Sequence, residues 1–140
     1  MRIAIKIIIG FILVAGLIIY WFFSKLTDVY SPTYNSVELI STKNQKLFIK
    51  SKNWGVTGDS QITIITNDEE REFEIDSTKQ IISKGLEPFL YKVSNDTLFL
   101  TLRQKIKIPN GFNSNWIIIQ NEVDNPTMMD LRHDKDFKKI

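Results

Sequence analysis

Cysteine is absent from the 140-residue sequence, and histidine occurs once, as His133. Without cysteine the chain has no disulfide, no zinc–thiolate site and no thiol nucleophile. A single histidine excludes a metal site built from several histidines. It also gives little support for a serine–histidine–aspartate triad, because it lies in a charged C-terminal segment. We therefore expect no catalytic residue, no metal site and no cofactor, and we interpret the protein as not being an enzyme.

An excess of charge of one sign is also lacking once the N-terminal segment is set aside. The whole chain carries 18 basic and 16 acidic residues, a formal net charge of +2. Arg2, Lys6 and Lys25 flank the first apolar run, so 15 basic residues remain against 16 acidic ones in the rest of the chain. A domain with nearly balanced charge gives no electrostatic basis for binding nucleic acid.

The longest apolar run extends from Ile7 to Phe23 and contains no charged residue. The uncharged stretch between Lys6 and Lys25 reaches roughly 27 Å as a helix, close to the ~30 Å hydrocarbon core of a bilayer. Aromatic residues gather at its far end, where amphipathic rings favour the membrane interface. We interpret residues 1–26 as a transmembrane signal anchor that contacts the lipid bilayer through Ile7–Phe23.

A cleaved signal peptide is the main alternative, because Arg2 and Lys6 precede the apolar run in the order typical of such peptides. The run is long for a cleaved signal, and only Val14–Gly16 resembles a cleavage site, so we expect the anchor to stay on the protein. Positive charge tends to remain on the cytoplasmic side, and more of it precedes the span than follows it. The flanks therefore predict a single-pass protein with its amino terminus cytoplasmic and its domain extracytoplasmic.

Beyond a tether predicted over residues 27–35, apolar and polar residues alternate, which is typical of strands. Three antiparallel hairpins are predicted, each from two alternating runs around a turn: residues 36–40 with 46–50, residues 61–66 with 72–76, and residues 89–93 with 98–102. Ile106 and Ile108 lead to a turn at Pro109–Gly111. Trp116–Ile119 is the most continuously apolar stretch, and we expect a central strand covered on both faces there.

These runs predict a mainly β fold of about seven or eight strands over residues 36–124, arranged as a small antiparallel sandwich or a strongly bent sheet. A short helix is predicted after it, with Asn125 as the cap and Pro126 at the first helical position. Met128 and Leu131 would share its inward face. Residues 125–140 are therefore expected to form a short helix followed by a charged, solvated tail.

The most distinctive local sequence lies between residues 52 and 59 and contains two glycines. Asn53, Trp54, Thr57 and Asp59 would form a ligand loop in which the indole stacks on a sugar or the polar groups hold a cation. The alternative is a connection between two strands with Trp54 tucked into the core, and we favour this structural interpretation. A phosphate-binding loop is poorly supported, because no Lys-Ser/Thr pair follows the second glycine.

Acidic residues recur between Asp68 and Asp76, and a strand there would place Glu72, Glu74 and Asp76 on one face. Carboxylates about 7 Å apart along a strand do not converge on one calcium ion. We interpret the run as a charged solvent face that protects an edge strand or pairs with lysines, with calcium or partner binding as the alternative.

Several segments of the domain resemble a group of short bacterial proteins of unknown function, which carry an N-terminal apolar segment and one small β domain. The segments that carry the resemblance are Trp54–Asp59, Thr63–Asn67, Gly85–Lys92 and Asn95–Leu98. The resemblance implies a bacterial envelope setting, with the bacterial inner membrane as the location, and it implies no activity.

Two functions remain open at this point. The first is a non-catalytic, membrane-tethered extracytoplasmic module that binds an envelope protein or a small ligand. The second is an accessory subunit of a membrane complex that acts mainly through its transmembrane helix, where Gly10, Ala15 and Gly16 permit close approach of another helix.

Overall fold

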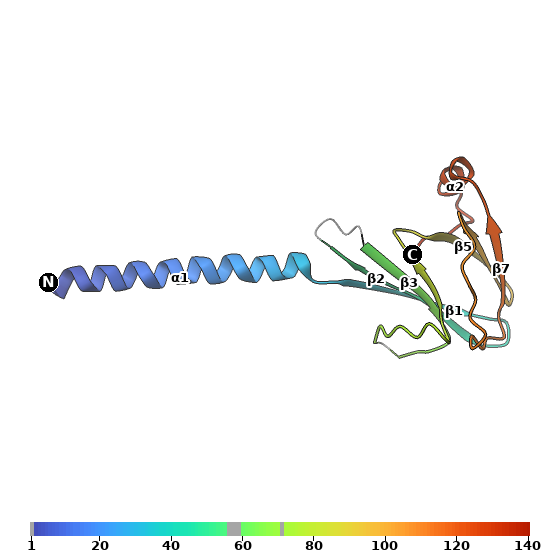
Figure 1. Ribbon diagram of the computed structural model, residues 1–140, viewed down its shortest axis with the longest axis horizontal. Coiled ribbons are helices and arrows are strands. Elements are labelled where there is room, and N and C mark those ends of the chain that lie inside the picture. Colours follow the sequence, from blue (N-terminus) through green and yellow to red (C-terminus); the bar gives the residue numbers. More distant parts are fainter. Residues whose placement is uncertain (1, 56–59, 71) are drawn as a thin grey trace. The chain divides into compact units, whose positions relative to one another are not determined.

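The computed structural model describes residues 2–55, 60–70 and 72–140 (Figure 1). The chain divides into two compact units, Met1–Ser31 and Pro32–Ile140. Among the described residues, the first unit is formed by a single helix, and the second contains seven strands in two sheets and a short helix.

The N-terminal helix α1 spans Arg2–Tyr30. Within it, the 21 residues of Ile5–Lys25 have a mean hydropathy of 2.5, and none of this stretch is buried. As predicted, the helix is long and apolar enough to cross a membrane. Most residues of the tether predicted over residues 27–35 belong to a helix or a strand, because α1 continues to Tyr30 and β1 begins at Thr33. The helix ends just before Pro32, whose ring disfavours helical backbone in the residue before it.

Four antiparallel strands form the first sheet, in the order β1-β2-β3-β4. Their bounds are β1 (Thr33–Ile40), β2 (Lys46–Trp54), β3 (Ser60–Thr66) and β4 (Ile81–Lys84). The predicted hairpin of β1 and β2 is confirmed, with Leu39 opposite Leu47 in the ladder. Asn44 lies in the turn with a φ of 57°, a left-handed conformation that asparagine tolerates better than most residues.

The second sheet has the order β5-β6-β7, with β5 (Phe89–Ser94), β6 (Thr97–Leu102) and β7 (Ile117–Glu122). The predicted hairpin of β5 and β6 is also confirmed, and Asn95 occupies its turn with a φ of 54°. β7 lies parallel to β6. A parallel pair needs a crossover of roughly a dozen residues or more, and residues 103–116 provide it.

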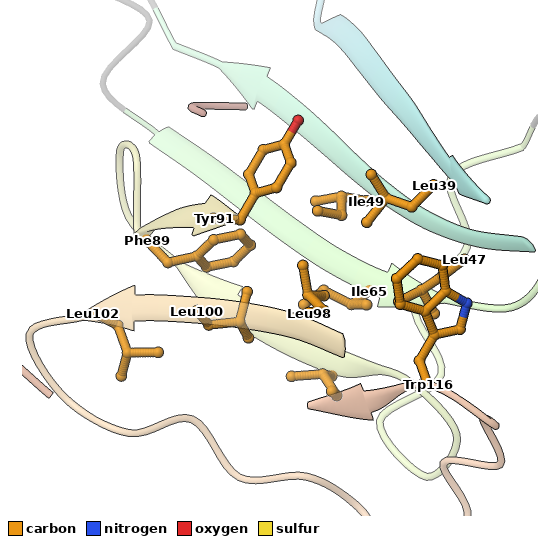
Figure 2. Close-up of a cluster of buried hydrophobic side chains, with 11 residues drawn as sticks. Leu39, Leu47, Ile49, Ile65, Phe89, Tyr91, Leu98, Leu100, Leu102 and Trp116 are labelled. Atoms are coloured by element: carbon orange, nitrogen blue, oxygen red, sulfur yellow. The ribbon is translucent and has the colours of Figure 1, made fainter. Parts of the chain in front are cut away.

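The inner faces of the two sheets share one hydrophobic core (Figure 2). The sheets supply its buried side chains and the crossover adds an indole: Leu39, Leu47, Ile49, Ile65 and Ile81 from the first sheet, Phe89, Tyr91, Leu98, Leu100 and Leu102 from the second, and Trp116. The predicted fold class is therefore confirmed: a mainly β domain of two packed sheets, with an N-terminal apolar helix and a short C-terminal helix.

Two of the predicted strands are wrong. Residues 72–76 belong to the connection between β3 and β4, and β3 pairs with β4 instead. Asp76 accepts hydrogen bonds from the amide and the hydroxyl of Thr78, at 2.9 and 2.5 Å, and this contact closes a turn where the strand was expected. Ile106 and Ile108 lie in the crossover, while the turn predicted at Pro109 is confirmed by a 3.0 Å bond from Phe112 N–H to its carbonyl.

Trp116–Ile119 is not a central strand covered on both faces. β7 is at the edge of its sheet, and Ile117 and Ile119 are 59% and 39% exposed. Trp116 precedes the strand and is buried in the core, and Ile118 packs against the same core. The stretch is continuously apolar because Trp116 and Ile118 face the core while Ile117 and Ile119 lie on the outer face.

The predicted C-terminal helix is present as α2 (Asn125–Leu131), but its cap is Asp124, whose carboxylate accepts a bond from Thr127 N–H at 3.0 Å. Met128 is buried, as predicted. Most side chains of the tail are exposed, as predicted, but its backbone is attached to the domain near its end. Lys138 N–H donates to the Tyr91 carbonyl at 2.8 Å, and Tyr91 N–H donates to the Lys138 carbonyl at 2.9 Å. Ile140 packs against the core.

Candidate functional site

The outer face of the first sheet is partly covered by the connection between β3 and β4. Phe48 and Ile64 point away from the core between the sheets, yet they are only 6% and 1% exposed. Phe73 packs against Tyr34 of β1, with ring centroids 6.1 Å apart and planes at 53°. The covering segment is thus held on β1 by an aromatic contact, which lies in the 4.5–7 Å range typical of such pairs.

Two lysines of β2 fix the start of the same segment. The Lys46 ammonium lies 2.9 Å from a Glu69 carboxylate oxygen and 3.0 Å from one of Glu38, and these hydrogen bonds raise the pKa of Lys46 above its ordinary value. Lys50 is buried, and its ammonium donates to the backbone carbonyl of Glu70. The acidic run was expected to pair with lysines, and the structure pairs Glu69 with Lys46 and Asp76 with Lys79, at 2.9 and 3.8 Å.

Two cavities share Phe73 in their walls. One has a volume of about 170 Å³, with Tyr34, Ser36 and Phe48 among its walls. The other has a volume of about 420 Å³ and is lined by Pro32, Lys52, Trp54, Ile62, Phe73 and Ile75. We call the two cavities together the Phe73 groove. Its walls are mainly aromatic and aliphatic, as in sites that bind apolar side chains.

Trp54 is the last residue of β2 and is 37% exposed at the wall of this groove. The interpretation that tucks Trp54 into the core is therefore wrong. The buried tryptophan is Trp116, which is 5% exposed and whose indole N–H donates to the Gln45 carbonyl at 3.3 Å. Strand parity explains the difference, because Leu47 and Ile49 face the core and so the even-numbered residues of β2 face outward.

The structure places the two described members of the predicted ligand loop on opposite faces of the sheet. Asn53 and Trp54 are consecutive in β2, so their side chains leave opposite faces of the sheet. Asn53 is half-buried, and its side-chain oxygen makes no hydrogen bond with any described residue. Thr57 and Asp59 lie outside the described residues. Of the two described members of the set, Trp54 is the one that lines the groove.

β1 forms one edge of the first sheet beside the Phe73 groove. It is eight residues long, and Thr33–Ser36 are all exposed. Within the described part of the chain, no strand pairs with its outer side. An edge strand of this kind presents unpaired N–H and C=O groups to another chain. Tyr34, Asn35 and Ser36 belong to this edge and also line the smaller cavity.

Charges of both signs line the groove: Lys50, Glu69 and Glu70 at the smaller cavity and Lys52 at the larger one, with both lysines close to aromatic rings. The Lys50 ammonium lies 5.6 Å from the Phe48 ring centroid, and the Lys52 ammonium lies 5.6 Å from that of Tyr34. At this distance a cation is attracted to the face of the ring. The groove thus combines aromatic and aliphatic walls with the charged side chains of Lys50 and Lys52 and, at the smaller cavity, of Glu69 and Glu70.

The acidic residues do not form a metal centre among the described residues, where no group of three or more His, Cys, Asp or Glu side chains could hold a metal ion. His133 is exposed just after α2. Sequence reasoning missed Tyr34, Phe73 and the open edge of β1. Parity along β2 would have placed Trp54 outward, but no local pattern places Phe73 on β1.

Comparisons of the chain with protein-family models, with curated proteins and with solved structures found no match.

Proposed function

We propose that the protein is a membrane-tethered β module that binds, without catalysis, an extended segment of a partner protein along β1. The observation that carries this function is the position of the open β1 edge directly beside the Phe73 groove. Addition of a strand to a sheet edge gives affinity through main-chain hydrogen bonds, and pockets beside the edge give specificity.

The neighbouring position of the two cavities supports this mode of binding. In an added strand, every second side chain points to the same face, about 7 Å from the previous one. The two cavities of the Phe73 groove are neighbours on the outer face and share Phe73. Consecutive outward side chains of a partner strand would enter them in turn. The preferred partner has apolar or aromatic residues at alternate positions, with a carboxylate near Lys52.

The domain is proposed to lie outside the cytoplasm, on a single-pass anchor in the bacterial inner membrane. The helix α1 supports the anchor by its length and composition. The greater number of basic charges before the span supports the orientation. The partner is accordingly a protein of the cell envelope.

Affinity capture of the full-length protein from its native membranes tests the proposal. Wild type is compared with Trp54→Ala and with Ile117→Ala, which removes an exposed apolar side chain from the other sheet. We expect a specific protein that wild type and Ile117→Ala retain and that Trp54→Ala loses. Equal recovery with all three proteins would contradict binding at the Phe73 groove.

The second candidate, an accessory subunit that acts through α1, is favoured by the free apolar surface of this helix, since none of Ile5–Lys25 is buried. Replacing Ile7–Phe23 with an unrelated membrane-spanning helix separates the two candidates. Retained capture of the partner supports the β module. Lost capture, with the domain still folded and in the membrane, supports the helix.

A further inference from the structure

A cleft of about 660 Å³ opens between the turn after β4 and the segment after β6. It is distinct from the Phe73 groove, with which it shares no lining residue. Its basic side chains are Lys84 at the end of β4, and Arg103 and Lys105 in the crossover. The volume falls in the range of roughly 300–1,000 Å³ that is common for small-molecule sites.

The three cations of the cleft have no carboxylate partner among the described residues. Glu87 is the acidic residue of the lining, and its carboxylate is already engaged by Arg132, with Nη2 2.7 Å from Oε2. This pair is 24% and 35% exposed, so it is better protected from solvent than the other ion pairs of the domain. The cleft therefore carries an excess of positive charge in a domain with nearly balanced charge.

Both walls of the cleft are held in place by hydrogen bonds that do not involve the side chains of Lys84, Arg103 or Lys105. On one side, Gly85 N–H donates to the Gln61 carbonyl at 2.9 Å, and Gly85 adopts a φ of 104° that glycine accommodates readily. On the other side, the side-chain amide of Gln120 bonds both the N–H and the carbonyl of Ile106, at 2.8 Å each. The backbone beside Lys105 is thus fixed while the ammonium and guanidinium groups stay available.

From this arrangement we propose that the cleft is a second binding site, and that it takes an anion bearing phosphate groups. Arginine presents a planar fork of donors that matches phosphate oxygens, and lysine adds a point charge. The cleft is large enough for more than one phosphate group. The phosphate is supplied either by a soluble ligand or by a lipid headgroup, and the chemistry of recognition is the same in both cases.

Full-length protein in phosphatidylcholine nanodiscs is titrated calorimetrically with inorganic pyrophosphate to test a soluble source. Retention of phosphatidylglycerol during delipidation, followed by native mass spectrometry, tests a lipid source. Both measurements are made on wild type, Arg103→Gln, Lys105→Gln and Lys135→Gln. Lys135 is an exposed lysine of the C-terminal tail outside the cleft, so its change removes the same charge elsewhere.

We expect one of the two ligands to bind wild type and Lys135→Gln alike, and to bind Arg103→Gln and Lys105→Gln roughly five- to tenfold more weakly. Binding should weaken further as salt is raised, because the contact is electrostatic. The ligand that shows this pattern identifies the source. Absence of binding by both ligands, or equal loss in Lys135→Gln, would overturn the proposal. Unchanged thermal unfolding of the variants shows that a loss of binding is not a loss of fold.

The positioning role of Gln120 gives a second test. Gln120→Leu removes both bonds to Ile106 but leaves every cation of the cleft in place. We expect the affinity for the ligand to fall while the slope of its salt dependence stays the same, because the number of charges is unchanged. An unaltered affinity, with the fold intact, would contradict a pre-arranged cleft.

Discussion

The Phe73 ring lies against Tyr34 of β1, with 6.1 Å between the ring centroids. This contact attaches the connection between β3 and β4 to the first strand of the domain, so the outer face of the sheet is covered next to β1. The outer edge of β1 is not paired with any strand of the described residues. The covered face buries Phe48 and Ile64, which would otherwise leave apolar surface in solvent. The contact between Tyr34 and Phe73 also forms part of the wall of the smaller cavity of the Phe73 groove.

Phe73→Ala should release the covering segment without unfolding the sandwich. Phe73 is half-buried, so we expect a loss of about 1–2 kcal/mol in the free energy of unfolding, below the ~3–5 kcal/mol of a fully buried phenylalanine. Limited proteolysis of the full-length protein should cut within residues 67–76 faster than in wild type. Ile75→Ala is the control, because Ile75 is 51% exposed in the same segment. Equal cleavage of both variants would show that the aromatic contact does not hold the segment.

The two tryptophans of the β domain, Trp54 and Trp116, should respond differently to truncation. Trp116→Ala leaves a cavity in the core and loses the bond to Gln45, so we expect a loss of about 3–5 kcal/mol, enough to unfold a marginally stable domain. Trp54→Ala should leave the melting temperature within about 4 °C of wild type, because Trp54 is partly exposed at the end of β2. Thermal unfolding of the two variants side by side gives the comparison. A larger loss for Trp54→Ala would contradict the placement of the two side chains.

The turn of the β1–β2 hairpin is linked to the turn of the β5–β6 hairpin by Asp96. Its carboxylate accepts bonds from the hydroxyl and the amide of Thr42, at 2.6 and 2.8 Å, and the hydroxyl bond in particular lowers the pKa of Asp96 below 3.8. Because the folded-state pKa is depressed, this contribution to stability is present above the unfolded pKa and is lost as the pH falls through the folded one. Thr42→Val should return the pKa of Asp96 toward 3.8. The pKa of Asp96 is measured from its carboxyl chemical shift as a function of pH. An unchanged titration midpoint in Thr42→Val would contradict the contact between Asp96 and Thr42.

The C-terminal tail should protect the outer edge of β5. Removing residues 137–140 eliminates the two backbone bonds between Lys138 and Tyr91 and the packing of Ile140 on the core. We expect a loss of about 2 kcal/mol in stability and faster hydrogen exchange at the Tyr91 amide. Lys139→Ala, in the same tail, is the control and should behave as wild type. Unchanged exchange after truncation would show that the tail does not pair in solution.

The two confirmed hairpins were predictable because their information is local. Alternation on both sides of Asn44 and Asn95 sets the strands, and asparagine accepts the left-handed backbone of the turns. The alternation of side chains along β2 also predicts that Trp54 points outward. The expectation that a tryptophan lies in the core favoured the opposite, and wrong, placement. Length and composition were sufficient to predict α1 as an apolar helix long enough to cross a membrane.

The remaining features depend on contacts between distant residues. Residues 72–76 alternate like a strand, yet the chain there places a single aromatic ring on Tyr34 and then turns at Asp76. The parallel pairing of β7 depends on a crossover clamped by Gln120, which no local pattern encodes. The Phe73 groove likewise needs β1, β2 and the β3–β4 connection to meet, so its walls could not be assembled from the sequence.

Site-specific photo-cross-linking at Tyr34 tests the central claim, that β1 and the Phe73 groove bind a partner. Tyr34 is 55% exposed on β1, and Ile117 is 59% exposed on β7, so p-benzoylphenylalanine at Ile117 is a matched control. In native membranes the probe at position 34 should capture one specific envelope protein, and the probe at position 117 should not. The same capture from both positions, or none from position 34, would contradict partner binding at β1.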